Sequence, residues 1–266
     1  MHPPGQPEAQ SAAGGDVTDA PRIDVVILAW NDGDVLPAAV ASALDSVGVS
    51  PRVVVVDNGS VPPVPPHEDD RVTVVRSPDN LGVPAGRNLG MRHGEAEWAC
   101  FLDSDARLEP TCLARLVEPL RDDPTVGLAA PVYRDQLPSA SAGLAPTLSD
   151  KVLRMTGRRD TYRAAEPPAG APWWEVDFAI GACQLIRRAA FDRVGGLDGR
   201  YRFGPEDVDF CLRLWQGGYR VVQVAAASCF HPARRGHRNV LSVRGVRHVA
   251  ALLPHLWKHR HFRRPQ

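Results

Sequence analysis

The chain has 266 residues, and 44% of them are hydrophobic, which is enough to form the core of one large α/β domain. Its formal net charge at pH 7 is zero, so the composition argues against a nucleic-acid-binding protein. The five cysteines include no CxxC pair, no apolar run approaches about 18 residues, and no signal-peptide pattern opens the chain, so we expect a cytoplasmic protein with reduced, buried thiols.

Apolar strands alternate with helical patterns through the first half of the chain. Residues 1–21 precede them and are rich in Pro, Gly, Ala and Asp, which predicts a disordered tail. We expect strands at 23–30, 52–56, 72–75, 98–102 and 126–132, and helices at 35–47, 84–93 and 110–121. Repeated strand–helix–strand units predict a mostly parallel sheet flanked by helices, that is, an α/β fold.

The second half of the chain begins with a long irregular stretch. Residues 134–172 carry many Pro, Ala, Ser and Gly residues and one basic patch, which indicates either a functional loop or partial disorder. Regular patterns then return, with strands expected at 176–186 and 219–224 and helices at 187–194 and 204–218.

Polar residues follow four of the expected strands, namely Asn31, Asp57, Ser77 and Asp103. Ligands of open α/β sheets bind at the carboxyl ends of the strands, so these residues predict a binding edge. Asp103 and Asp105 are two residues apart, which places both carboxylates on one side of an extended chain. Such a pair suits Mg²⁺ or Mn²⁺, although aspartates are also common in turns and helix caps.

Three further candidates each allow two interpretations. Glu206 and Asp207 open a helix, where acidic residues are favoured by the helix dipole, but Asp207 lies outside the apolar stripe and could act as a general base in a cleft. Arg87 is either a solvated side chain, or it neutralises a phosphate or meets a base edge beside the helix. His231, after the last strand, is either structural or a metal ligand. Neither a GxGxxG fingerprint nor a P-loop occurs.

The order of these motifs resembles glycosyltransferase family 2, the inverting enzymes of GT-A fold, and is nearest to its bacterial rhamnosyltransferase-like branch. The segments that carry the resemblance are VVVVDNGS, NLGVPAGRNLG, FLDSDA and the long IGACQLIRRAAFDRVGGLDGRYRFGPEDVDFCLRLWQGGYRV, followed by a histidine. The resemblance spans residues 22–231, and it implies a GT-A domain with a Rossmann-like nucleotide-binding half. Residues 134–172 would then form an acceptor loop.

The resemblance also implies roles for single residues. Asp207 would be the catalytic base, and Asp103, Asp105 and His231 would hold Mg²⁺ or Mn²⁺ on the donor diphosphate. The nucleotide-sugar site would comprise Trp30, Asn31, Asp57, Arg87, Asp103, Ser104, Gly181, Ala182 and Glu206. Within it, Asp57 would contact the base, Arg87 would lie near the base and diphosphate, and Gly181 and Ala182 would line the sugar pocket.

The reaction implied is transfer of a sugar from a dTDP- or UDP-sugar to a hydroxyl of a glycan, a lipid-linked acceptor or a small molecule. Single displacement with inversion needs one acidic cluster at the leaving diphosphate and a separate carboxylate at the attacking hydroxyl. A sugar-phosphate nucleotidyltransferase is disfavoured, because the loop AWNDGDVL after the first strand has no basic residue. A catalytically degenerate nucleotide-sugar-binding or scaffolding protein of the same fold is the second hypothesis.

Residues 232–266 carry Arg, Lys and His but no acidic residue, and apolar residues recur at helical spacing. Such a basic amphipathic helix is typical of a membrane-surface element, and it would place the enzyme at the inner face of the plasma membrane. The other interpretation is a C-terminal helix that packs on the sheet or on a second subunit in a homodimer. Pro254 would interrupt a long helix.

Overall fold

The computed structural model describes residues 20–134, 136–145, 163–165, 167–202, 204–232, 258–259 and 262. The expected disordered tail, much of the expected acceptor loop and most of the basic C-terminal extension lie outside these residues. Their boundaries, the membrane contact and the homodimer therefore stay predictions. Among the helices of the described residues, none has the length and apolar character needed to cross a bilayer.

The helices and strands follow the alternation that the sequence predicts. The strands are β1 (Arg22–Ala29), β2 (Ser50–Asn58), β3 (Val72–Ser77), β4 (Trp98–Asp103), β5 (Arg107–Leu108), β6 (Val126–Tyr133), β7 (Ala142–Gly143), β8 (Trp173–Glu175), β9 (Phe178–Ala179), β10 (Cys183–Arg187) and β11 (Arg220–Phe230). The helices are α1 (Leu36–Leu44), α2 (Val83–Met91), α3 (Cys112–Asp122), α5 (Arg188–Arg193) and α6 (Glu206–Gln216), with a 3₁₀ turn at Pro138–Ala140.

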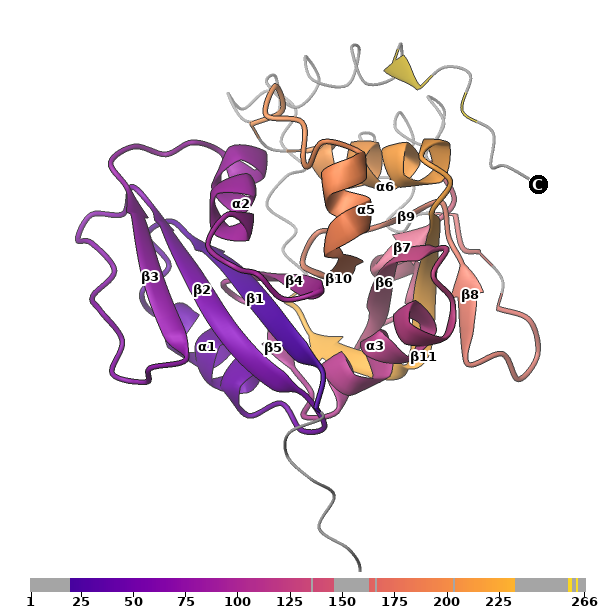
Figure 1. Cartoon of the computed structure of the whole chain (residues 1–266), viewed down its shortest axis with the longest axis horizontal. Coiled ribbons are helices and arrows are strands. Elements are labelled where there is room, and N and C mark those ends of the chain that lie inside the picture. The colour runs from indigo at the N-terminus through magenta and orange to yellow at the C-terminus, as the bar shows by residue number, and fades with distance from the viewer. Residues whose placement is uncertain are drawn as a thin grey trace, which may run out of the picture.

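The central sheet is mixed, as expected, and runs in the order β3-β2-β1-β4-β10-β6-β11-β5, with β8 beside β11. Its N-terminal half, from β3 to β4, is parallel throughout. Strand β10 lies antiparallel between β4 and β6, and β11 runs parallel to β6. Figure 1 shows the parallel half and the second half of the sheet meeting at β4 and β10. The sheet therefore has the two halves that the GT-A expectation requires.

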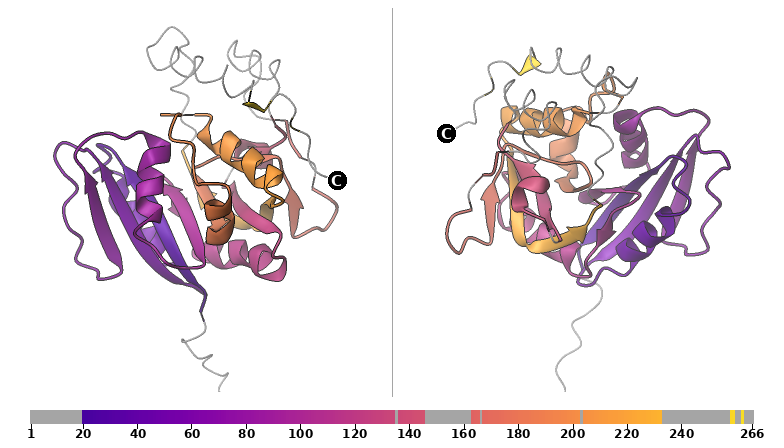
Figure 2. Two further views of the ribbon diagram at one scale, coloured as in Figure 1. Left: turned by 45° about the horizontal axis from the view of Figure 1, so that its top comes forward. Right: turned by 180° about the vertical axis from the view of Figure 1, so that it is seen from behind.

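Helices cover both faces of the sheet, and each face has its own apolar core. Alternate residues of β1 illustrate the division, because Ile23, Val25 and Ile27 belong to the core that includes α1 and α3, while Val26 belongs to the core that includes α2, α5 and α6. The arrangement can be followed in the views of Figure 2. All five cysteines are free and buried, as the sequence predicts.

Two expected strands differ from those found. The single strand expected at 176–186 is instead β9 and β10, because the chain turns at Gly181 and Ala182. In that turn the Ala182 carbonyl accepts a hydrogen bond of 2.9 Å from the Asp103 amide. The last strand, expected to end at Val224, continues through an irregularity to Phe230. The short strands β5, β7 and β8 were not expected, because two or three residues are too few to show a period.

Candidate active site

Parallel strands bring the first two predicted carboxylates to one edge of the sheet. β1 lies between β2 and β4, with Ala29 paired to Asp57 and Leu28 paired to Asp103. Both aspartates therefore lie beside the last two residues of β1, at the same edge of the sheet, as the sequence predicts.

A cluster of three potential metal ligands forms where β4 and β11 end. The ligating atoms of Asp103, Asp105 and His231 all lie within 4.8 Å of one another. His231 Nε2 is 3.7 Å from Asp103 Oδ2 and 3.7 Å from Asp105 Oδ1. The antiparallel pairing of β11 with β5 carries His231 back to this point. Two hard carboxylates and one imidazole fit Mn²⁺ or Mg²⁺, so this donor set suits the expected ion.

Arg87, on α2, fixes the orientation of Asp103. Its Nη2 donates 2.6 Å to Asp103 Oδ1 and 2.7 Å to the Gly181 carbonyl, and its guanidinium lies 5.1 Å from the centre of the Phe101 ring. Because Oδ1 is engaged by Arg87, the other oxygen of Asp103 is the one that faces His231. The guanidinium is almost fully buried, at 3% exposure, and its Nε donates to none of the described residues. Contact of Arg87 with a base or diphosphate stays a prediction.

Gly181 links the two carboxylate clusters. Its amide donates 3.3 Å to Asp207 Oδ2, while its carbonyl accepts from Arg87, which in turn holds Asp103. A Cβ at this position would lie 2.5 Å from Arg87 Nη1, so any other residue would require the guanidinium to move. Asp207 Oδ1 accepts the amide of Val208 at 2.8 Å. Hydrogen bonds therefore connect Asp207 to Asp103 through Gly181 and Arg87. The two carboxylate clusters of the predicted site are joined in this way. Whether Gly181 and Ala182 line a sugar pocket stays a prediction.

Glu206 opens α6 as a buried carboxyl group. Only 6% of it is exposed, and its Oε2 has no hydrogen-bond partner among the described residues. Burial, and after it the neighbouring charge of Asp207, raises its pKa from the ordinary value of 4.5 to about 7. A half-protonated carboxyl at neutral pH can both donate to and accept from a sugar hydroxyl. Its predicted place in the nucleotide-sugar site is supported by this unsatisfied oxygen and stays a prediction.

Replacing Glu206 by Gln is expected to stabilise the protein at pH 8 but not at pH 5. A carboxyl whose pKa is raised on folding binds more protons in the folded state, so the free energy of unfolding falls as the pH rises from 4.5 to about 7. The cost, fully present above that range, is at most about 3 kcal/mol, and Gln avoids it because it cannot ionise. Urea unfolding at the two pH values measures the difference. The exposed control Glu95→Gln should keep the wild-type pH dependence; equal stabilisation by Glu206→Gln at both pH values would contradict the prediction.

The predicted residues Trp30 and Asn31 form the loop after β1. Trp30 is 44% exposed, as a side chain available to a ligand would be. Asn31 has a φ of 57°, its amide donates 3.0 Å to Ser60 Oγ, and its Oδ1 accepts from the amide of Val61 at 2.8 Å. These bonds tie the loop after β1 to the loop after β2.

Ser104, between the two aspartates of the metal cluster, makes its contact with a residue that sequence reasoning did not single out. Its hydroxyl donates 2.7 Å to Asp32 Oδ2, which also accepts the Trp30 amide at 3.2 Å. Asp32 therefore joins the loop after β1 to the loop after β4. The sequence signal that could have identified Asp32 is its position one residue beyond Asn31, at the end of a strand.

Asp57 is fully buried, and protein groups engage both of its oxygens. Oδ1 accepts the Ser60 amide at 2.8 Å, and Oδ2 accepts the Val64 amide at 3.1 Å and pairs with Arg76. Burial raises its pKa, but these hydrogen bonds outweigh burial and hold the pKa below the usual value. Contact between Asp57 and a nucleotide base stays a prediction. Sequence analysis missed the half-exposed Arg76, at the end of β3, because its partner Asp57 lies on another strand, β2.

The family models and relatives that this chain matches are named as glycosyltransferases. The model of Glycosyl transferase family 2 matches residues 24–195, and one described as Glycosyltransferase (GlcNAc) matches 142–253. An N-acetylglucosaminyl-diphospho-decaprenol L-rhamnosyltransferase of Mycobacterium tuberculosis is 27% identical, over 79% of this chain and 75% of that protein. A pre-mycofactocin glycosyltransferase of the same organism is 33% identical, over 69% of this chain and 38% of its own length.

Solved structures agree on the fold. A mannosyltransferase from Pyrobaculum calidifontis, in complex with GDP-Man and Mn²⁺, superposes with a TM-score of 0.64 at 21% identity, over 95% of this chain and 68% of that one. The fold is thus the GT-A fold, and with the sequence matches it makes this protein a glycosyltransferase. The family model covers more than half of the sequence. The chain belongs to glycosyltransferase family 2, and its similarity to a bacterial rhamnosyltransferase confirms the resemblance seen in the sequence.

Proposed function

We propose that the protein is an inverting glycosyltransferase that moves a hexosyl or deoxyhexosyl group from a nucleoside-diphosphate sugar to an acceptor hydroxyl. The observation that carries the proposal is the pair of carboxylate clusters joined through Gly181. Asp103 and Asp105 serve the leaving diphosphate, and Asp207 serves the attacking hydroxyl. A retaining enzyme that works by double displacement would need a carboxylate that bonds to the anomeric carbon, whereas inversion needs a base alone.

The donor side binds and orients the diphosphate. Asp103, Asp105 and His231 would hold Mg²⁺ or Mn²⁺, which when bound neutralises charge on the leaving diphosphate as a Lewis acid. Arg87 keeps Asp103 in place through its 2.6 Å contact. As the bond from the anomeric carbon to the diphosphate oxygen breaks, its electron pair leaves with the nucleoside diphosphate.

The acceptor side supplies the base. The acceptor oxygen forms the new bond to the anomeric carbon on the face opposite the diphosphate, and its proton passes to a carboxylate oxygen of Asp207. Gly181 and Val208 hold that carboxylate through their amides, at 3.3 and 2.8 Å. The fixed orientation reduces the loss of freedom that the transition state requires.

Donor and acceptor are proposed from the relatives. A dTDP- or UDP-sugar and a lipid-linked acceptor are the first substrates to test, because one relative is named as a rhamnosyltransferase acting on a decaprenol-linked sugar. Synthesis of a cell-envelope glycan would follow from such an activity. A glycosylated small molecule is the second acceptor class, since another relative is named for mycofactocin.

Thermal unfolding with UDP, dTDP, GDP or CMP, each with Mn²⁺, Mg²⁺ or EDTA, tests the donor site. A nucleotide at 100 times its dissociation constant stabilises the fold by about 2.7 kcal/mol. We expect one nucleotide to raise the melting temperature with a divalent ion but not with EDTA. Mass-spectrometric detection of sugar transfer from the matching donor then tests the activity. Stabilisation by no nucleotide, together with no donor turnover, would instead support the non-catalytic scaffold.

A further inference from the structure

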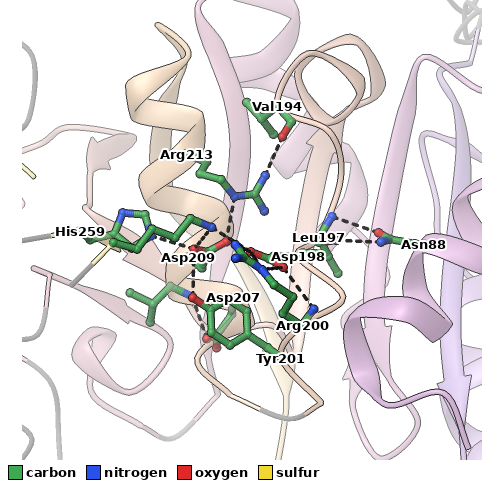
Figure 3. A network of polar contacts seen from close by, with 12 residues as sticks. Asn88, Val194, Leu197, Asp198, Arg200, Tyr201, Asp207, Asp209, Arg213 and His259 are labelled. Atoms are coloured by element: carbon green, nitrogen blue, oxygen red, sulfur yellow. Dashed lines mark hydrogen bonds and ion pairs between the residues drawn. The ribbon is translucent and has the colours of Figure 1, made fainter. Parts of the chain in front are cut away.

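A buried carboxylate lies two residues beyond the proposed base. Asp209 is in the first turn of α6 and is fully buried. Tyr201, Arg213 and His259 reach its carboxylate (Figure 3), and Lys258 reaches it as well. Lys258 Nζ and His259 Nε2 lie 2.6 and 2.7 Å from Asp209 Oδ1. Two residues near the end of the sequence thus contact the helix that carries Asp207.

The same lysine also reaches the loop between α5 and α6. Lys258 Nζ donates 2.9 Å to Asp198 Oδ2 and lies 5.9 Å from the centre of the Tyr201 ring. We call Asp198, Tyr201, Asp209, Lys258 and His259 the Asp209 cluster. Within it, Lys258 connects the loop at 197–202 to the first turn of α6.

That loop in turn contacts α2. Asn88 makes two hydrogen bonds with the backbone of Leu197, at 2.8 and 3.0 Å, and the Val83 amide donates 2.9 Å to the Arg202 carbonyl. Asn88 follows Arg87, which holds Asp103. Figure 3 shows the Leu197–Asn88 contact beside the contacts of Asp209. The loop therefore lies between the helix that positions the donor side and the helix that positions the acceptor side.

Electrostatics make these contacts stronger than a surface ion pair. Burial raises the pKa of Asp209, but hydrogen bonds from His259, Lys258 and Arg213 outweigh burial and hold the pKa well below the usual value, so the carboxylate is charged. A buried charge needs partners, and among the described residues Lys258 and Arg213 are the Lys and Arg side chains that pair with Asp209. The His259 side chain is 4% exposed, and Phe262 packs against the apolar core that includes the buried residues of α6.

We propose that Lys258 and His259 are positioning residues for the transfer reaction. They act through Asp209 and Asp198, and they hold the first turn of α6, with Asp207, at its working distance from Asp103. This inference rests on the proposed function, in which Asp207 is the base. Simple attachment of the chain end to the domain is the competing explanation, and it predicts an effect on stability alone.

The test compares full-length Lys258→Ala, His259→Ala and the double variant with wild type. Lys258→Arg is the conservative rescue, and Arg121→Ala, at an exposed ion pair on α3, is the matched control. Three quantities are measured: the affinity for the stabilising nucleotide with Mn²⁺, kcat and KM for sugar transfer, and amide hydrogen exchange. Exchange is read at 197–209 and 80–90, with 23–29 as the internal reference.

We expect the alanine variants to lower kcat by about 10- to 100-fold while nucleotide affinity stays within about twofold, because a misplaced base slows chemistry without weakening the donor site. Exchange should rise at 197–209 but not at 23–29, and Lys258→Arg should restore most of kcat. Unchanged kcat, or kcat and nucleotide affinity falling together, would overturn the proposal. If wild type transfers no sugar, the proposed function fails, and unchanged exchange at 197–209 would separately overturn the positioning.

Discussion

Replacing Asp207 by Asn is expected to lower kcat by about 10³-fold and to leave nucleotide affinity within about twofold. Asn has nearly the same shape and can still accept the Val208 amide, at present 2.8 Å from Oδ1. It cannot take the proton of the acceptor hydroxyl, so the loss falls on the chemical step. Steady-state transfer kinetics and titration calorimetry with nucleotide and Mn²⁺ measure the two quantities separately.

A matched carboxamide substitution controls for charge. Asp122→Asn, at the exposed end of α3, removes one negative charge far from the site and should keep wild-type kcat. Full transfer by Asp207→Asn would assign the base to another group, with Glu206 the nearest carboxyl in the sequence. Loss of nucleotide binding in the same variant would place Asp207 on the donor side.

The metal cluster gives the second large effect. Asp105→Asn and His231→Gln are each expected to weaken metal-dependent nucleotide binding by at least about tenfold, because each removes one of three donor groups. Asp103 is a poorer choice, since its loss would leave the buried Arg87 without its carboxylate partner. Calorimetric titration of the nucleotide with Mn²⁺ and with EDTA gives the metal-dependent part of the affinity.

His93→Gln, at an exposed histidine just beyond α2, is the control for the histidine change and should bind like wild type. Nucleotide affinity that is equal with Mn²⁺ and with EDTA in wild type would contradict a metal site at Asp103, Asp105 and His231. Variants that keep the full difference between Mn²⁺ and EDTA would place the ion elsewhere.

Long apolar strands made the first half of the fold predictable. The strands at 23–30, 52–56 and 98–102 are apolar because both faces of the parallel half are covered, so their polar ends Asp57 and Asp103 were visible as interruptions. The break at Gly181 was not, because a two-residue turn between apolar segments leaves the apolar run intact. At this turn the Gly181 carbonyl accepts from Arg87, about 90 residues earlier in the chain, and one sequence does not show such a contact.

The candidate site divides in the same way. Asp103 and Asp105 are two residues apart, so the sequence alone suggested them as a pair. The roles of His231 and Asp207 came from the resemblance to glycosyltransferase family 2. The partners of Asp209 could not be found, because an acid at a helix start has a sufficient local explanation in the helix dipole. Lys258 lies in a run of basic residues whose amphipathic pattern indicated a membrane surface, whereas its contacts are with Asp198 and Asp209.

The order of strands in the sheet has a consequence for synthesis of the protein on the ribosome. The parallel half from β3 to β4 is complete once residue 103 has emerged, but β10, α6 and β11 follow only after residue 183. Because the chain is synthesised from its N-terminus, the residues of β1 to β4 are available for their parallel pairing while Asp207 and His231 are still to be made. Under the proposed mechanism, a nascent or prematurely terminated chain would therefore lack both the third metal ligand and the base, so neither metal-dependent donor binding nor sugar transfer is expected until the last strand is in place.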